Sequence, residues 1–174
     1  KKKFAIYGMG RSGYATARAL RLSKAEFICW DDNKALRSKF KKNNFIFQKF
    51  WTINNFQKID YIVISPGIDL DNCNISFFLK KNFHKVITDI DLFFNAVGHQ
   101  NIIAITGTNG KSTTCKILEN IFTKAGYDAQ VGGNIGRPAL LLKQSKIKKN
   151  IVYILEVSSY QLVYSKQFRA KHAA

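Results

Sequence analysis

The sequence lacks a long apolar run, and this limits where the protein can reside. No uninterrupted apolar stretch approaches the roughly 20 residues that a membrane-spanning helix needs. The opening lysines resemble the start of a signal peptide, but the apolar stretch that follows, residues 4–7, is too short and runs into glycines. We therefore predict no membrane insertion and no signal peptide.

Cysteine is scarce. The three residues Cys29, Cys73 and Cys115 are widely spaced and form no CxxC pair, which argues against a disulfide framework or a zinc site. They fit free thiols in a reducing cytosol, so we expect a cytoplasmic protein. Cys115 falls within an expected helix, where a small buried apolar side chain is the favoured interpretation.

Acidic residues are few: 11 Asp and Glu stand against 28 Lys and Arg, a formal charge of +17. Nucleic-acid binding is the obvious interpretation of such a charge. The lysines are scattered, however, as in 39–42 and 146–149, and Lys, Asn and Ile are abundant together, as compositional drift would also produce. We expect no nucleic-acid partner; anionic nucleotide substrates would benefit from the same field.

Short apolar strands alternate with amphipathic helices, which predicts an α/β fold with parallel strands. We expect strands over residues 4–7, 26–30, 60–64, 86–88, 101–106, 127–131 and 151–155, and helices after the first strand, over 89–96 and over 111–124, with Gly126 as the last helix stop.

The segment Val97-Gly98-His99-Gln100 interrupts this alternation, after which a strand, a glycine-rich turn and a helix begin again. We therefore predict two domains. Residues 1–97 would form a Rossmann-like nucleotide-binding domain, and residues 98–174 the start of a P-loop-type ATP-binding domain with a mostly parallel sheet.

A phosphate-binding loop is predicted between the expected strand at 101–106 and the following helix. Glycines allow backbone N–H groups to surround phosphate oxygens, and the helix N-terminus adds its positive end. Lys111 would bridge the β- and γ-phosphates of ATP, and the Ser112 hydroxyl would bind Mg²⁺. Ile105 replaces the first glycine of the usual pattern, so a glycine-rich turn with an incidental lysine is the alternative. The predicted ATP-binding residues are Gly107, Thr108, Asn109, Gly110, Lys111, Ser112 and Thr113.

Glu156 ends the apolar strand expected at 151–155. A carboxylate at the carboxyl end of a strand can reach a magnesium ion beside the phosphates. Alone it would equally be an ordinary exposed charge. Together with the loop, it predicts a metal site formed by Ser112 and Glu156.

A second glycine motif, Gly8-x-Gly10-x-x-Gly13, follows the first strand, and Asp31 and Asp32 end the next one. This pattern matches a dinucleotide-binding fingerprint. Taken alone it suggests NAD, but a uridine diphosphate has the same pyrophosphate and a ribose, and Asp31 could accept hydrogen bonds from a ribose or uracil donor. The residues do not separate these two ligands.

Six segments together resemble the MurD-type Mur ligases in their order and spacing. They are Gly8 to Gly13, Ser65-Pro66-Gly67-Ile68, Thr88 to Phe93, Gly107 to Thr113, Gly132-Gly133-Asn134-Ile135-Gly136 and Glu156 to Leu162. The resemblance covers essentially the whole chain. It implies an ATP- and Mg²⁺-dependent, ADP-forming ligase that adds D-glutamate to UDP-N-acetylmuramoyl-L-alanine through an acyl phosphate in peptidoglycan synthesis.

The resemblance also implies residue roles. Lys111 and Glu156 would be catalytic. The UDP-linked substrate would be bound by Gly10, Arg11, Ser12, Asp31, Ser65 and Gly67 in the first domain and by Asn134 and Gln161 in the second. A glycine-flanked Asn134 could instead simply tolerate a positive φ. By resemblance we expect a monomer.

The sequence departs from the family at two places: Asp32-Asn33 stand where a Thr-Arg pair is frequent, and Val163 where a glutamate is usual. The first adds a negative charge near the expected diphosphate.

The chain begins with Lys and reads as a truncated part without the C-terminal domain. We expect this part alone to show little turnover. The alternatives are an NAD-dependent dehydrogenase and a non-catalytic nucleotide- or nucleic-acid-binding protein.

Overall fold

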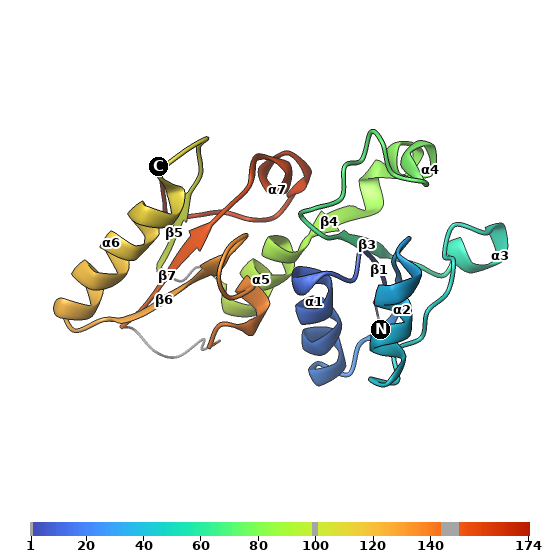
Figure 1. The fold of residues 1–174 in the computed structure, drawn as a ribbon, viewed down its shortest axis with the longest axis horizontal. Helices are drawn as coiled ribbons and strands as arrows, with labels where there is room; N and C mark the ends of the chain where they lie inside the picture. Colours follow the sequence, from blue (N-terminus) through green and yellow to red (C-terminus); the bar gives the residue numbers. More distant parts are fainter. Residues whose placement is uncertain (1, 99–100, 144–149) are drawn as a thin grey trace. The chain divides into compact units, whose positions relative to one another are not determined.

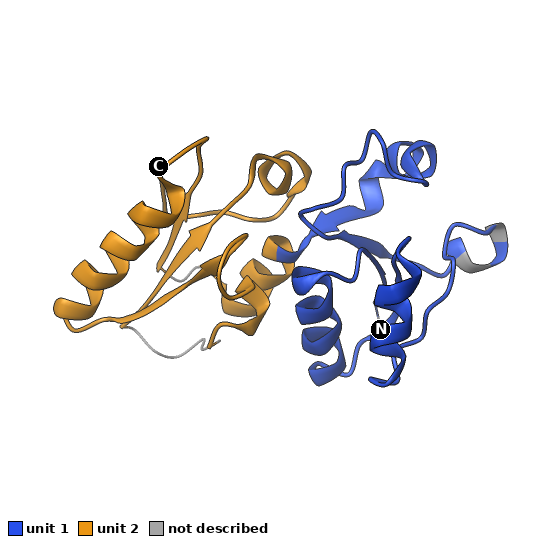
Figure 2. Ribbon diagram, in the orientation of Figure 1, with its two compact units in different colours: residues 1–89 blue, residues 90–174 orange. Residues whose placement is uncertain are grey.

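The computed structural model describes residues 2–98, 101–143 and 150–174 (Figure 1). They form two compact units, Lys1–Asp89 and Ile90–Ala174 (Figure 2). Each unit contains a four-stranded sheet in which every strand pair is parallel. The α/β class predicted from the sequence is confirmed. In the part of the chain that is described, no helix is both long and apolar enough to cross a membrane.

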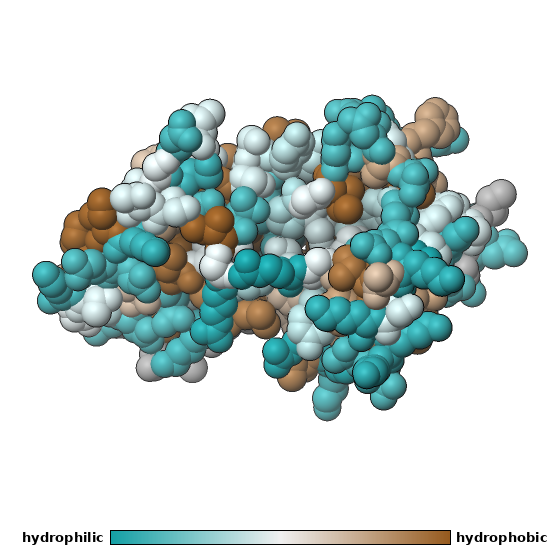
Figure 3. All heavy atoms as spheres, viewed as in Figure 1, coloured by the Kyte–Doolittle hydropathy of each residue, from teal (hydrophilic) through white to brown (hydrophobic). Residues whose placement is uncertain are grey.

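The first unit has the strand order β2-β1-β3-β4. Ala5, Ile6 and Ile62 in its central strands are fully buried, as expected for a parallel sheet covered on both faces. Its elements are β1 (Lys3–Tyr7), α1 (Arg11–Leu22), β2 (Glu26–Trp30), α2 (Lys34–Lys41), α3 (Ile53–Phe56), β3 (Tyr61–Ile64), α4 (Ser76–Lys81), the 3₁₀ turn η1 (Phe83–Lys85) and β4 (Val86–Thr88). On the face that Figure 3 shows, hydrophilic side chains predominate over this unit.

The second unit has the order β6-β7-β5-β8. All six residues of β7 are buried, and Val152 and Ile154 pack with Ile105 and Cys115 in one apolar cluster. The elements are α5 (Asp89–Val97), β5 (Asn101–Ile105), α6 (Lys111–Lys124), β6 (Asp128–Gly133), the 3₁₀ turn η2 (Ala139–Leu141), β7 (Ile151–Glu156), α7 (Ser159–Tyr164) and β8 (His172–Ala173).

Helix α5 accounts for the position of the division between the units. The sequence suggested a boundary after Val97, whereas the units divide after Asp89, because α5 packs within the second unit. The Phe93 ring meets that of Tyr153 edge-on with 5.0 Å between centroids. The fully buried Asp91 carboxylate accepts hydrogen bonds from the Ser165 hydroxyl (2.6 Å) and from backbone N–H groups that include that of Phe168 (2.9 Å). His99, Gln100 and the lysine run at 146–149 lie outside the described residues.

The expected strands are present with small changes in their ends. Strand β6 begins one position later than expected and continues to Gly133, since Gly132 and Gly133 still pair with Leu155 and Glu156 of β7. The expected helix at 111–124 has those bounds, and Gly126 follows it with φ +83°. Cys115 is fully buried, as its interpretation as a core residue required, and burial raises the pKa of its thiol to about 11.

Candidate functional site

The predicted phosphate loop connects β5 to the amino end of α6. Gly110 is the N-cap of α6 and has φ +77°, a left-handed conformation that suits glycine. Glycine has no side chain with which to cap the N–H groups of the first helical turn. A helix amino end of this kind is suited to binding an anion, because its N–H groups and the helix dipole both favour negative charge.

The Lys111 side chain turns back over the loop. Its ammonium group donates hydrogen bonds to the backbone oxygens of Gly107 (2.6 Å) and Thr108 (3.1 Å). These two hydrogen bonds hold the positive charge at the loop. A bound phosphate would offer stronger, charge-assisted bonds than these carbonyl groups do.

Glu156 lies beside the loop. Ile105 and Glu156 are paired residues of β5 and β7, so their strands end side by side and bring the carboxylate to the start of α6. The Ser112 hydroxyl donates a 2.8 Å hydrogen bond to Glu156 Oε2, and Glu156 is only 2% exposed. The structure thus brings together three residues that the sequence predicted to act together: Lys111, Ser112 and Glu156.

These groups fit a magnesium ion. Mg²⁺ prefers oxygen ligands and usually takes one or two from the protein, with the rest from phosphates and water. A hydroxyl and a carboxylate 2.8 Å apart are such a pair. Over the described ranges no three His, Cys, Asp or Glu side chains gather as a complete metal cage, so the phosphates would have to complete the coordination.

Asn134 and Gln161 lie in different settings in the same unit. Asn134 is exposed, and its backbone N–H donates to the backbone oxygen of Glu156 (2.8 Å). The positive φ values here belong to Gly133 and Gly136 and not to Asn134, so backbone tolerance does not explain the asparagine. Gln161 is 1% exposed, and its side-chain oxygen accepts from the Ser158 N–H (3.0 Å) in the capping box of α7. Substrate contact by either residue remains a prediction.

In the first unit, the glycine loop between β1 and α1 is tightly packed. A Cβ atom on Gly13 would lie 1.8 Å from the Gly8 oxygen, which no side chain can do. Gly10 differs: a Cβ there would meet no atom within 4 Å. A Cβ on Gly8 would lie 2.9 Å from the Ser65 Cβ, so packing requires both Gly8 and Gly13. Gly10 leaves open space in which a pyrophosphate could approach the backbone.

Two predicted substrate-binding residues hold this loop. Asp31 accepts hydrogen bonds from the N–H groups of Met9 (2.6 Å) and Asn33 (2.8 Å). The Ser65 hydroxyl donates to the Gly8 oxygen (2.7 Å). Their observed contacts are thus with the protein. The other residues predicted for this site lie at the surface or are half-buried: Arg11, Ser12 and Gly67.

Asp32 departs from the family pattern and adds a negative charge near the expected diphosphate. Its carboxylate accepts hydrogen bonds from the Tyr7 hydroxyl (2.5 Å) and from Trp30 Nε1 (3.1 Å). Burial, and next the contact with Asp32, raise the pKa of Tyr7. The added negative charge is therefore satisfied within the unit.

Sequence reasoning missed Arg37. This guanidinium group from α2 donates to the backbone oxygens of Asp31 (2.5 Å) and Asp32 (3.1 Å). It also lies over the Trp30 ring, 4.5 Å from its centroid. A positive charge consequently sits where the two adjacent aspartates follow β2, and it offsets them. Only the folded backbone brings the start of α2 back to this point.

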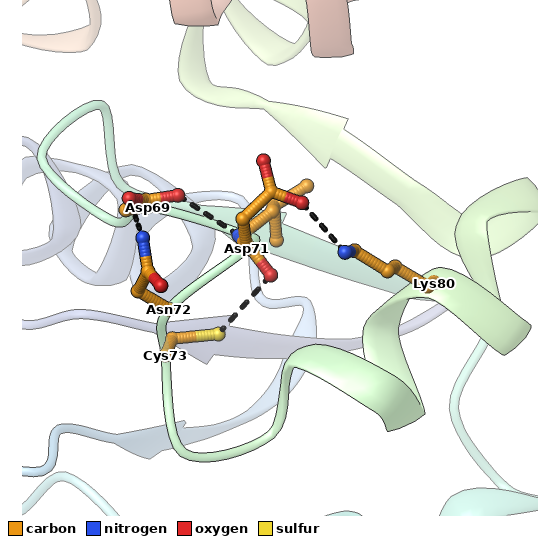
Figure 4. A network of polar contacts seen from close by, with 6 residues as sticks. Asp69, Asp71, Asn72, Cys73 and Lys80 are labelled. Atoms are coloured by element: carbon orange, nitrogen blue, oxygen red, sulfur yellow. Dashed lines mark hydrogen bonds and ion pairs between the residues drawn. The ribbon is translucent and has the colours of Figure 1, made fainter.

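The segment after Ser65-Pro66-Gly67 is held by its own polar network (Figure 4). Asp69 accepts from the side chain of Asn72 (2.7 Å) and from the N–H of Asp71 (2.8 Å), and Lys80 forms a 2.6 Å ion pair with Asp71. The Asn72 contact, with the others, lowers the pKa of Asp69. These contacts restrain the loop near Gly67 and show no feature of a catalytic site.

Comparison with known proteins agrees with this geometry. Residues 105–172 match the family described as the Mur ligase middle domain. The fold is similar to the murein peptide ligase Mpl of Psychrobacter arcticus, with a TM-score of 0.55 and 16% identity, over 99% of this chain and 42% of that one. The family match thus lies in the second unit, and the similarity in fold extends over essentially the whole chain.

Relatives of higher sequence identity all carry the name of one kind of Mur ligase. The chain is 41% identical to the UDP-N-acetylmuramoylalanine--D-glutamate ligase of Rickettsia felis over 99% of its length, and 40% identical to the ligases of the same name from Rickettsia bellii and Rickettsia prowazekii. These relatives confirm the resemblance found in the motifs. The chain spans 37% of the length of the Rickettsia felis protein.

Proposed function

We propose that this chain supplies the nucleotide-binding parts of an ATP-dependent ligase that adds D-glutamate to UDP-N-acetylmuramoyl-L-alanine in peptidoglycan synthesis. The observation that carries the proposal is the grouping of Lys111, Ser112 and Glu156 at one strand-loop-helix junction. Three relatives that are 40–41% identical over 99% of this chain bear this enzyme's name.

The reaction requires activation of the alanyl carboxylate, because a free carboxylate is a poor electrophile. Its oxygen would attack the γ-phosphorus of ATP, the bond to the bridging oxygen would break, and ADP would leave. The amine of D-glutamate would then attack the acyl carbon of the mixed anhydride. Phosphate would leave with the electron pair, and the amine would lose a proton as the amide forms.

The protein groups at the junction suit the first of these steps. The Lys111 ammonium, released from the Gly107 and Thr108 oxygens, would neutralise charge on the transferred phosphoryl oxygens. Ser112 and Glu156 would hold Mg²⁺, which supplies Lewis-acid stabilisation of the same phosphates. The loop N–H groups would orient them. Among the residues that the structure describes, we assign none as the base that takes the proton from the amine.

The glycine loop of the first unit would bind the UDP part. The open space at Gly10 and the adjacent Arg11 and Ser12 would face the diphosphate, with Gly67 on the neighbouring loop. Asp31 and Ser65 would act mainly by holding this loop in shape, as their contacts with Met9 and Gly8 indicate. We further propose a cytoplasmic monomer, and little turnover by this chain alone because its relatives are much longer.

An assay of the complete protein that carries this chain tests the proposal. We expect ADP release that requires UDP-N-acetylmuramoyl-L-alanine, Mg²⁺ and D-glutamate together, and little release with L-glutamate or with other UDP-linked acceptors. Equal release with every amino acid would contradict the proposed specificity. Tight NADH binding without ATP affinity, or steeply salt-dependent DNA binding, would instead favour one of the two alternatives.

A further inference from the structure

A groove unrelated to the glycine loop lies in the first unit at the amino-terminal end of its sheet. It has a volume of about 440 Å³, within the range of small-ligand sites. Phe4 and Phe27 at the starts of β1 and β2 line it, as do Ile59 before β3 and the segment 44–46. The glycine loop follows the opposite, carboxyl end of β1, so the groove needs a separate explanation.

The groove also lies at an open backbone edge. The backbone N–H of Cys29 in β2 donates to the backbone oxygen of Ile46 (2.8 Å), and the backbone oxygen of Cys29 accepts from the Gln48 N–H (3.0 Å). In a parallel strand, residues two apart present their N–H and C=O groups on the same side, so those of Phe27 face this edge too. Within the described residues, neither group of Phe27 has a hydrogen-bond partner. The edge is thus paired at Cys29 and open at Phe27.

The polar lining of the groove is mainly positive. Lys3 is paired with Glu26 (2.9 Å), and the Arg21 guanidinium lies over the Phe45 ring, 4.3 Å from its centroid. Lys58 is exposed and forms no ion pair or hydrogen bond with any described residue. The lining therefore has an excess of positive charge beside apolar walls.

We propose that this groove binds a short extended peptide with a free carboxylate. Its backbone would pair with the Phe27 N–H and C=O as an added piece of strand, an apolar side chain would fill the space between Phe4, Phe27 and Ile46, and the carboxylate would meet the cationic rim. This combination requires a ligand with an amide, an apolar side chain and a negative charge, which a peptide C-terminus provides. The proposal does not depend on the ligase activity.

A nuclear magnetic resonance titration of the full chain with N-acetyl-Val-Phe tests it. We expect saturable shifts of the Phe27 and Ile46 amide signals and no saturable shifts at residues 8–13. The C-terminal carboxamide, and a peptide N-methylated at the Phe nitrogen, should each bind about fivefold more weakly or worse, as expected for one lost charged or backbone contact.

Matched variants locate the site. Ile46→Glu, at a 63% exposed position, should abolish the shifts, whereas Leu22→Glu, at an 80% exposed position outside the groove, should leave them unchanged. Lys58→Glu should weaken binding and Lys81→Glu, with the same change of net charge, should not. The proposal is overturned by an absence of saturable binding, by equal binding of the N-methylated peptide, or by equally tight binding of 4-phenylbutyrate, which lacks the amide.

Discussion

The two glycine loops of this chain have the same place in their units but different chemistry. Both lead from a parallel strand into the helix that follows. The first is tied to its own protein by Asp31 and Ser65 and is packed so closely that Gly13 touches the Gly8 oxygen. The second has the αL residue Gly110 at its helix start, the Lys111 ammonium bonded to the loop, and the Glu156 carboxylate bonded to Ser112.

This difference suits the first loop to binding a ligand and the second to stabilising charge during a reaction. A rigid loop with its carboxylate turned to backbone N–H groups can cradle a diphosphate without competing charge. A loop with an ammonium group and a metal-binding pair can stabilise charge that moves during a reaction. The glycine pattern alone therefore indicates a phosphate, and the charged residues around it indicate whether chemistry follows. The predictions below test this contrast.

The largest effect is expected from removal of the Lys111 ammonium. In the complete enzyme, Lys111→Ala should lower substrate-dependent ADP release by about a hundredfold to a thousandfold, as loss of a charge-stabilising donor does. Lys124→Ala in the last turn of the same helix is the control and should retain activity. Near-normal turnover of Lys111→Ala would show that the Lys111 ammonium takes no part in the reaction, and the proposed contrast between the two loops would then fail.

Glu156→Gln should act through the metal. It keeps the size and one oxygen of the side chain but removes the charge, so we expect the Mg²⁺ concentration for half-maximal activity to rise by about tenfold or more. UDP-substrate affinity should change little, because we propose that the UDP part binds at the loop of the first unit. An unchanged Mg²⁺ requirement would assign Glu156 a structural role toward Ser112.

In the first loop, two glycines should separate packing from binding. Gly13→Ala places a methyl group against the Gly8 oxygen and should lower the free energy of unfolding by about 2 kcal/mol or more. Gly10→Ala meets no protein atom, so its stability should change little while UDP affinity falls. Urea unfolding and UDP titration of both variants measure this. Equal stability of the two would mean that the loop relaxes more freely than its contacts indicate.

The parts of the structure predictable from sequence are those determined locally. Helix α6 has the predicted bounds because glycines flank it at Gly110 and Gly126 and a strand precedes it. The predicted meeting of Ser112 and Glu156 is not local in sequence, but it follows from a general rule of parallel sheets: the strands end at one edge, so residues that follow neighbouring strands lie close together.

What the sequence could not predict depends on contacts between distant residues. The hydrogen bond from the Met9 N–H to the Asp31 carboxylate could not be predicted, because only the folded loop brings these two residues together; nucleotide contact by Asp31 stays a prediction. Strand β8 is two exposed residues, too short for any pattern, and exists because β5 has an edge to pair with. Asp32 adds a negative charge near the expected diphosphate, and only the folded unit supplies the Tyr7 and Trp30 donors that satisfy it.

The smallest effect concerns the core beneath the second loop. The ordinary pKa of a cysteine thiol is 9.0, and burial, together with the nearby Glu156 carboxylate, raises that of Cys115 to about 11. Above pH 9 the unfolded chain can ionise this thiol while the folded chain keeps it protonated, so stability present below pH 9 is lost as the pH rises toward 11. At pH 10 the loss from this group should be about 1 kcal/mol.

Urea unfolding at pH 8 and pH 10 checks this. The decrease between the two values should be smaller in Cys115→Ala than in the parent chain. Comparison of the two pH values within each variant removes the cost of the cavity itself. Because Glu156 contributes to the raised pKa, Glu156→Gln should also shrink the decrease, and this connects the core thiol to the loop that carries the charge. The free energy of unfolding of Cys115→Ala could instead decrease as much as that of the parent. Other groups, such as Cys29 with its pKa of about 12, would then account for the loss of stability at alkaline pH.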